Sequence, residues 1–210
     1  TNQKERKEKN YTFVLFNVES AGALINTLKE PLDYPVNDDG IATLFRIPYA
    51  QYLRFSCDYR RFFTLSPKQA LAFHTVLGLG IPYGNMDVLP FEKSFYVGGA
   101  NGIRAWPIRT IGPGSYSDVS DSTRFDKTGD FGLEISLEYR FPIYSTFNGA
   151  IFLDAGNVWL KNKNSQYPGG HFGLNRFYKE LAIGTGFGLR LDFSFFLIRL
   201  APGGPFSQER

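Results

Sequence analysis

The feature of this sequence that most constrains its fold is a strict alternation of apolar and polar residues. From Leu133 to Phe141 every odd-numbered residue is apolar or aromatic, whereas the even-numbered ones are Glu134, Ser136, Glu138 and Arg140. Successive side chains of a β-strand point to opposite faces. A period of two therefore predicts a strand with one apolar face and one charged face.

The same alternation recurs along the chain and predicts about seven strands. Aromatic residues make up 17 % of the sequence and glycine occurs 22 times, which favours short strands joined by turns and excludes a helical bundle. The predicted strands, of which the first and last have the weakest pattern, are Tyr11–Glu19, Leu53–Tyr59, Leu71–Leu79, Leu133–Phe141, Gly149–Asn157, Leu181–Leu191 and Phe195–Leu200.

The connections between these strands alternate in length. Short links are expected at 64–69, 142–148 and 192–194, and long ones at 20–42, 80–132 and 160–180. Short turns on one rim and long loops on the other are typical of an outer-membrane barrel. Apolar runs reach only about four residues, far below the roughly 18 that a membrane helix needs.

Alternation alone does not say which face of a strand points outward. A soluble β-sandwich or a small ligand-binding barrel would alternate in the same way. Several charges within one strand, as at Arg54, Asp58 and Arg60, together with the long polar loops, favour a membrane barrel with a charged interior. The soluble β-domain binding a small ligand stays open as an alternative.

The residues that could support catalysis or metal binding are few and scattered. His74 and His171 are separated by a strand and a long loop, with no further histidine or cysteine at the spacing of metal ligands. Cys57 lies on the apolar face of its strand, as a small hydrophobic residue would. A triad of Ser136, His74 and Asp154 lacks any recognisable hydrolase motif. We expect no enzymatic activity, no metal and no cofactor.

Charge gives little sign of a nucleic-acid partner. The chain carries 23 basic and 20 acidic residues, a net charge of +3. The one local basic cluster lies within residues 1–10, where Glu5 and Glu8 interrupt it. We interpret residues 1–10 as a solvated end and expect no nucleic-acid binding.

Three short motifs follow one another in a familiar order. They are GGANGIRAW at Gly98–Trp106, SLEYRFP at Ser136–Pro142 and IFLDAGNVW at Ile151–Trp159. Together they resemble the BamA/TamA superfamily, also called the bacterial surface antigen family, and Phe95–Tyr116 is similar to its TamA-like branch. The family motif usually has glycine after its arginine, whereas this chain has Ala105, which restricts the backbone there.

The resemblance implies an all-β fold: an antiparallel transmembrane β-barrel, of which this chain supplies about seven of 16 strands. Residues 11–200 would be the C-terminal part of the barrel, with loop 80–132 inserted into the lumen and residues 201–210 as a tail. Earlier strands and soluble POTRA repeats would precede them. The implied location is the outer membrane of a Gram-negative-type bacterium.

The resemblance also implies a function, which is non-enzymatic. The protein would be an insertase or translocase component that assists insertion or secretion of outer-membrane proteins, through a weak seam between first and last strands. Its partners would be outer-membrane lipids, client proteins and periplasmic accessory proteins. A two-partner-type secretion pore of the same superfamily is the alternative.

One set of site residues follows from the resemblance. It implies that Arg104 of the inserted loop pairs with Glu138 and Asp154 of the wall, within a loop motif that includes Gly98, Gly99, Gly102, Ile103 and Trp106. The alternation independently assigns Glu138 and Asp154 to the polar faces of neighbouring strands. The planar guanidinium suits two carboxylates. The expected role is architectural, a lock for the loop.

Three glycines share the polar face of the strand at 181–191. They are Gly184, Gly186 and Gly188. Their missing side chains would leave room for the inserted loop, although a simple bulge or bend would also use glycine.

The number of crossings predicts that this chain cannot close a barrel alone. Seven crossings that start on the short-turn side end on the long-loop side, whereas the family ends on the periplasmic side, so at least one last strand is missing. We expect no folded monomeric barrel from residues 1–210 in detergent, as tested by heat-modifiable migration and protease digestion. A heat-modifiable, protease-resistant monomer would contradict this.

Overall fold

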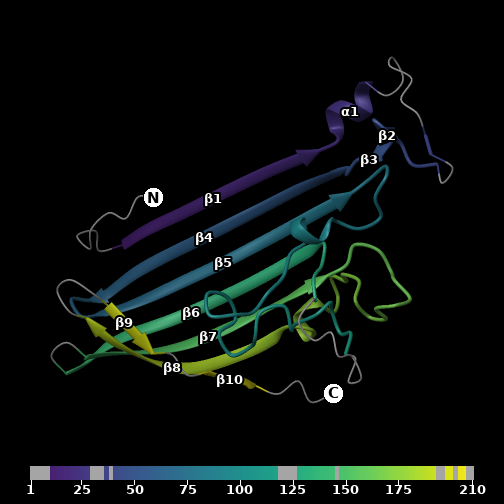
Figure 1. Ribbon diagram of the computed structural model, residues 1–210. Coiled ribbons are helices and arrows are strands. Elements are labelled where there is room, and N and C mark those ends of the chain that lie inside the picture. Colours follow the sequence, from purple (N-terminus) through teal and green to yellow (C-terminus); the bar gives the residue numbers. More distant parts are fainter. Residues whose placement is uncertain are drawn as a thin grey trace.

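The computed structural model describes residues 10–28, 36–37, 40–117, 127–144, 147–192, 197–200 and 203–206. One antiparallel sheet dominates it, in the order β1-β4-β5-β6-β7-β8-β10, with β9 also paired to β8 (Figure 1). Its strands are β1 (Asn10–Ala21), β4 (Tyr52–Ser66), β5 (Gln69–Pro82), β6 (Phe131–Tyr144), β7 (Phe147–Trp159), β8 (Ala182–Asp192), β9 (Leu197–Leu200) and β10 (Gly203–Phe206).

The remaining elements lie in the connections. They are α1 (Ala23–Leu28), the two-stranded hairpin of β2 (Thr43–Leu44) and β3 (Ile47–Pro48), and the 3-10 turns η1 (Phe91–Lys93) and η2 (Phe177–Lys179). Within the described part of the chain, no helix has the length and apolarity to cross a membrane.

Short turns and long loops fall on opposite rims, as the sequence predicted. Two residues separate β4 from β5, whereas residues 83–130 separate β5 from β6. Figure 1 shows this long connection lying across β6 and β7 instead of standing away from the sheet. It is slightly shorter than the predicted 80–132, because Gly80 and Gly132 are still part of the strands.

Several strands extend beyond their alternating pattern. β4 continues to Ser66 although Arg60 and Arg61 follow each other directly. Arg61 lies on the outward face, where its guanidinium stacks over the Phe63 ring at 5.0 Å and hydrogen-bonds to Thr12. A long cationic side chain near a rim keeps its stem on apolar surface and its charge at the edge.

The last strand is built from two segments. Leu200 pairs with Leu189 and Gly203 pairs with Gly186, so β9 and β10 meet β8 in one continuous register. The sheet therefore has seven crossings, as predicted, but the last continues into 203–206, which the sequence analysis assigned to a tail. Gly203, Gly204 and Pro205 carry no strand pattern, so alternation could not reveal them.

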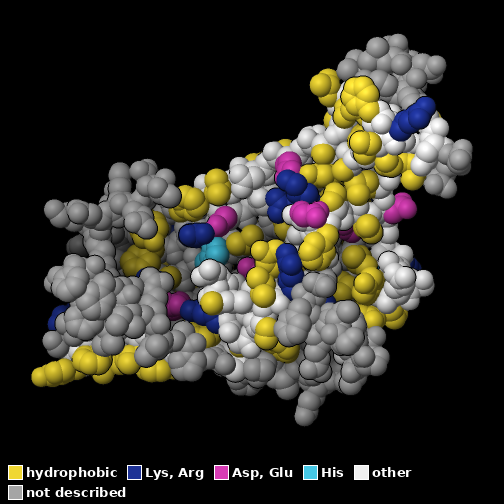
Figure 2. Space-filling model, in the orientation of Figure 1, with side chains coloured by type: hydrophobic (Ala, Val, Ile, Leu, Met, Phe, Trp, Pro, Cys, Tyr) yellow, Lys and Arg dark blue, Asp and Glu magenta, His cyan; other side chains and the backbone are white. Residues whose placement is uncertain are grey.

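The two faces of the sheet have the polarity of a membrane barrel. Leu153 is 49 % exposed on the outer face, with Leu137, Ile151, Ile183 and Phe187 similarly exposed. Asp154, next in sequence, is 0 % exposed on the inner face. Figure 2 shows charged side chains gathered between the sheet and the inserted loop. A soluble β-domain with a dry apolar interior is therefore wrong for this chain.

The outward apolar face predicts a depth-dependent cost for charge. Leu153 lies at the middle of β7, so Leu153→Arg should cost about 2–4 kcal/mol, because the charge would enter hydrocarbon. Tyr144→Arg, at the rim end of β6, should cost only about 0–1 kcal/mol. Urea unfolding of the full-length protein in lipid vesicles measures both. Equal costs at the two positions would contradict the assignment of the outer face.

Candidate functional site

Arg104 is the centre of a hydrogen-bonded cluster between the inserted loop and the inner face. Its Nε donates to Asp154 Oδ2 at 2.9 Å and its Nη2 donates to Oδ1 at 2.8 Å, a two-point contact. The backbone N–H of Arg104 also donates to Oδ2 at 3.0 Å. Its Nη1 donates to Glu138. The structure thus brings together the three residues that the sequence analysis linked.

The strand register explains why one arginine reaches both carboxylates. Ser136 is directly opposite Asp154 across the β6–β7 ladder, and Glu138 is opposite Phe152. Glu138 and Asp154 are therefore diagonal neighbours on the inner face. The Arg104 guanidinium lies over the Phe152 ring, 3.7 Å from its centre, so the cation is also held by an aromatic face.

Ser136 completes the cluster in a role that the sequence analysis did not assign. Its hydroxyl donates to Asp154 Oδ1 at 2.7 Å and accepts from Arg104 Nη2 at 3.1 Å. The structure does not assemble a triad with His74, whose Nε2 lies 3.0 Å from Asp58 Oδ1. The position of Ser136 between two glutamates of the polar face was the available signal.

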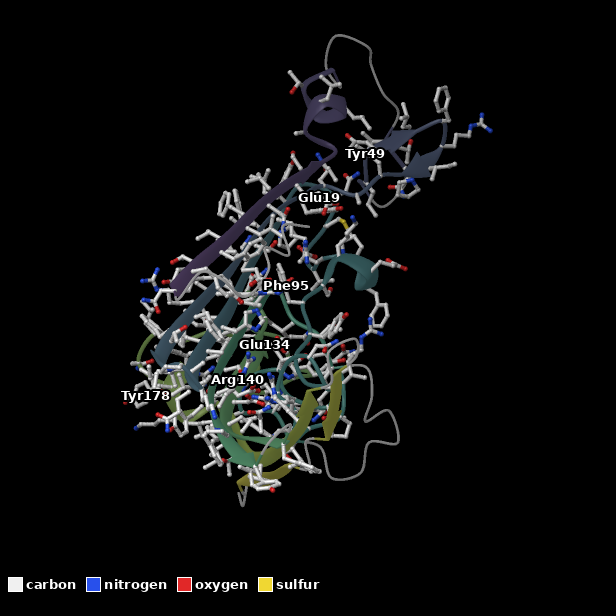
Figure 3. The ribbon with its side chains drawn as sticks, turned by 90° about the vertical axis from the view of Figure 1, so that its left-hand side faces the viewer. Glu19, Tyr49, Phe95, Glu134, Arg140 and Tyr178 are labelled. Atoms are coloured by element: carbon white, nitrogen blue, oxygen red, sulfur yellow. The ribbon has the colours of Figure 1, made fainter. Side chains whose placement is uncertain are left out.

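Glu138 is shared by three guanidiniums. Besides Arg104, Arg140 Nε and Arg190 Nη2 each donate to its Oε1 at 2.7 Å. These arginines come from β6 and β8, so Glu138 ties the loop to the strands on both sides of β7. Figure 3 shows Phe95, Glu134 and Arg140 following one another along the inner face.

The cluster is largely shielded from water. The side chains of Arg104, Glu138 and Asp154 are 15 %, 10 % and 0 % exposed. Burial alone would lower the pKa of the Arg104 guanidinium, but the hydrogen bonds and charges of Asp154 and Glu138 outweigh it and raise that pKa above its usual range. Arg104 therefore stays charged, and removing it would leave the buried Asp154 carboxylate without a cation.

The loop motif forms a tight turn around Arg104. Gly98 and Gly99 have φ of 95° and 88°, the left-handed region that glycine adopts without strain. Gly99 N–H donates to the Trp106 carbonyl at 2.8 Å, which closes the turn. Ile103 is fully buried, and Trp106 Nε1 donates to the Ile183 carbonyl of β8 at 3.4 Å.

The loop is seated where strand residues lack side chains. A Cβ at Gly102 of the loop would lie 2.4 Å from Glu134 Oε1, and one at Gly184 of β8 would lie 2.6 Å from the Ala105 Cβ. A Cβ at Gly156 of β7 would lie 2.3 Å from the Leu133 carbonyl of β6 and 2.9 Å from Ile103 Cδ1 of the loop. Glycine at these positions therefore permits the close approach of loop and wall.

The predicted glycine strand provides one such seat. Gly184 lies beneath Ala105, whereas Gly186 and Gly188 lie opposite Phe152 and Ala150 of β7. For Gly186 and Gly188 a role in making room for the loop stays a prediction. The role of all these residues as a lock is likewise a prediction, although their geometry suits it.

Ala105 fits where the family usually has glycine. The described residues with positive φ other than glycine are Phe45, Arg46 and Arg109, so Ala105 does not need the left-handed conformation. Its methyl group occupies the space above Gly184. The departure from the family motif is thus accommodated by a missing side chain on β8.

The cluster has the chemistry of a structural contact. Its carboxylates are saturated by guanidinium, hydroxyl and backbone donors, an arrangement that fixes a loop. Among the described residues, no group of three His, Cys, Asp or Glu side chains is placed to hold a metal ion.

Comparison with known proteins gives a family and a similar fold. Residues 46–210 match the family described as "Omp85 superfamily domain". The outer membrane protein assembly factor BamA of Neisseria meningitidis serogroup B (strain ATCC BAA-335 / MC58) is 27 % identical over 127 residues, covering 57 % of this chain and 16 % of that protein. The crystal structure of BamA from Haemophilus ducreyi lacking POTRA domains 1-3 has a TM-score of 0.59 at 16 % identity, covering 95 % of this chain and 48 % of that one.

These matches bear on fold and extent. The structural likeness, at its low sequence identity, shows the fold alone, and it confirms the predicted partial antiparallel barrel. The chain spans about half of the solved relative and a smaller part of the curated one.

Removing the arginine should release the loop at a large cost. Arg104→Ala should destabilise the full-length protein by about 3–5 kcal/mol, because the fully buried Asp154 loses its cation and Glu138 loses one of three. Arg104→Lys should recover part of this, since lysine keeps the charge but not the planar fork. Urea unfolding in lipid measures both, with exposed Arg46→Lys as the control. A cost below about 1 kcal/mol for Arg104→Ala would indicate a hydrated cluster.

The close contact between Ala105 and Gly184 predicts that substitutions at these two positions compensate for each other. Gly184→Ala should place two methyl carbons 2.6 Å apart and destabilise the loop, and Ala105→Gly in the same protein should relieve the clash. Protease cleavage within 98–106 and the unfolding midpoint report the outcome. If Ala105→Gly fails to restore either quantity, Gly184 serves another purpose.

Proposed function

This chain belongs to the Omp85 superfamily, and from that premise we propose that it is the C-terminal part of an outer-membrane machine that assists the insertion or secretion of outer-membrane proteins. The family resemblance inferred from the three motifs is confirmed. As a member of that superfamily, the chain is an outer-membrane protein of a Gram-negative-type bacterium. Its affinity to the TamA-like branch stays a prediction.

The observation that carries the proposal is the family match together with the loop held by Arg104. The relative from Neisseria meningitidis is described as an outer membrane protein assembly factor. An inner loop held by Asp154 and Glu138 fits an assembly component, since it stiffens the centre of the wall and makes no contact of this kind with β9 or β10 among the described residues.

The edge at β9 and β10 supports the proposed mechanism. Within the described residues, β9 and β10 pair with β8 alone, in one register. Strand amides and carbonyls that lack partners in hydrocarbon are costly, so a strand that is paired on one side favours pairing with an incoming strand on the other. We propose that such an edge receives client strands.

We further propose that the action is non-enzymatic. In this view the protein makes and breaks only hydrogen bonds and apolar contacts, and its partners are outer-membrane lipids, client barrel proteins and periplasmic accessory proteins. The preceding strands and the POTRA repeats belong to the same proposal.

The test is client insertion by the full-length protein. Proteoliposomes that contain it should accelerate the folding of an unfolded client barrel, measured by heat-modifiable migration, relative to empty liposomes. Arg104→Ala should reduce that acceleration several-fold, whereas Arg46→Lys should leave it unchanged. Folding no faster than in empty liposomes would overturn the proposal.

A second substrate separates the proposal from a secretion pore. If a secreted, non-barrel polypeptide becomes protease-protected inside the liposomes while the client barrel gains nothing, the protein is a two-partner-type pore. Acceleration of the barrel client without such protection supports the insertase.

A further inference from the structure

The first half of the inserted loop contacts a different part of the sheet from Arg104. Lys93, at the end of η1, forms an ion pair with Glu19 of β1. The same Glu19 oxygen accepts a hydrogen bond from the Tyr52 hydroxyl at 2.7 Å. Figure 3 shows Glu19 above Phe95 on the inner face, with Glu134 beyond it. The loop therefore reaches the first strand of the sheet as well as its centre.

Arg54 of β4 holds the backbone of the same loop segment. Its Nε donates to the Lys93 carbonyl at 3.0 Å, and its guanidinium lies 4.3 Å from the centre of the Phe95 ring. Arg54 is the residue directly opposite Glu19 in the β1–β4 ladder. One cross-strand pair of opposite charge thus binds both ends of Lys93: Glu19 contacts its ammonium and Arg54 contacts its carbonyl.

Phe95 holds the loop segment near Lys93 against the sheet. A Cβ on Gly78 would lie 2.3 Å from its ring, and one on Gly132 would lie 3.0 Å from its Cβ. These two glycines face each other across the β5–β6 ladder, so they form a single notch. Phe95 also exchanges two backbone hydrogen bonds with Gly129, each of 2.9 Å. The segment that carries Lys93 is therefore held against the sheet by several contacts close to Lys93.

Lys93 keeps its positive charge in this contact. Its hydrogen bond to Glu19 raises the pKa of the ammonium above its usual range. Its side chain is 41 % exposed and that of Glu19 is 36 % exposed, so the pair is closer to a surface contact than the Arg104 cluster is. Its effect should be local and modest.

We propose that Lys93 and Glu19, supported by Tyr52 and Arg54, are a second and separate anchor of the inserted loop, which positions strand β1. Within the described residues β1 pairs with β4 alone. The anchor gives β1 a further connection, through the loop, to β6 and β7. This inference concerns the loop and the sheet, and it does not depend on the identity of any client.

Hydrogen exchange of the full-length protein in lipid tests the anchor. Glu19→Gln and Lys93→Gln should each speed amide exchange roughly two- to fivefold in residues 17–21 and 91–95, because local opening becomes easier. The double variant should be no faster than either single one, since both lose the same contact. Exchange in β6 and β7 should not change, which shows that the variants fold.

Two controls make the test specific. Glu92→Gln, on the same turn of η1, should leave exchange unchanged in both segments. Arg104→Ala should speed exchange in 98–106 and leave 91–95 protected. Three outcomes would each overturn the proposal. Exchange at β1 could be unchanged in the Lys93 variant, or the effects could be additive in the double variant. Arg104→Ala could also cause an equal loss of protection at 91–95 and 98–106.

Discussion

The structure depends on a charge that must be paired inside the wall of a membrane protein. Asp154 has no access to solvent, and a buried carboxylate without a partner is costly. Arg104 supplies that partner from a loop instead of from a neighbouring strand, so we expect the wall to need the loop in place. Glu138 and Arg140 of β6 and Arg190 of β8 extend the same requirement to the strands on either side of β7. The loop is thus a structural part of the sheet.

Much of this arrangement could be predicted from sequence, because two independent signals agreed. Alternation assigned Glu138 and Asp154 to one face, and the motif around Arg104 supplied the cation. Alternation alone left the polarity of the faces open, since a period of two is the same in water and in lipid. The several charges within one strand favoured a charged interior, and the structure has one. Ser136 was missed because a serine between glutamates is an ordinary polar residue until the register places it opposite Asp154.

Other features left no local pattern to find. Lys93 and Glu19 are 74 residues apart, and neither lies in a motif. Gly78 and Gly132 appear as unrelated glycines in two strands, and only the ladder makes them one notch for Phe95. The segment Gly203–Phe206 is rich in residues that disfavour strands, yet it continues the register of β9. Each miss concerns long-range pairing, which a one-dimensional pattern does not encode.

The row of loop contacts has a mechanical consequence for the sheet. Leu89 rests on Gly80 of β5, Phe95 on Gly132 of β6, Ile103 on Gly156 of β7 and Ala105 on Gly184 of β8. One loop thus contacts four consecutive strands on their inner face, and these contacts constrain the curvature of the sheet. The curvature of these four strands therefore depends on the loop as well as on the hydrogen bonds between them.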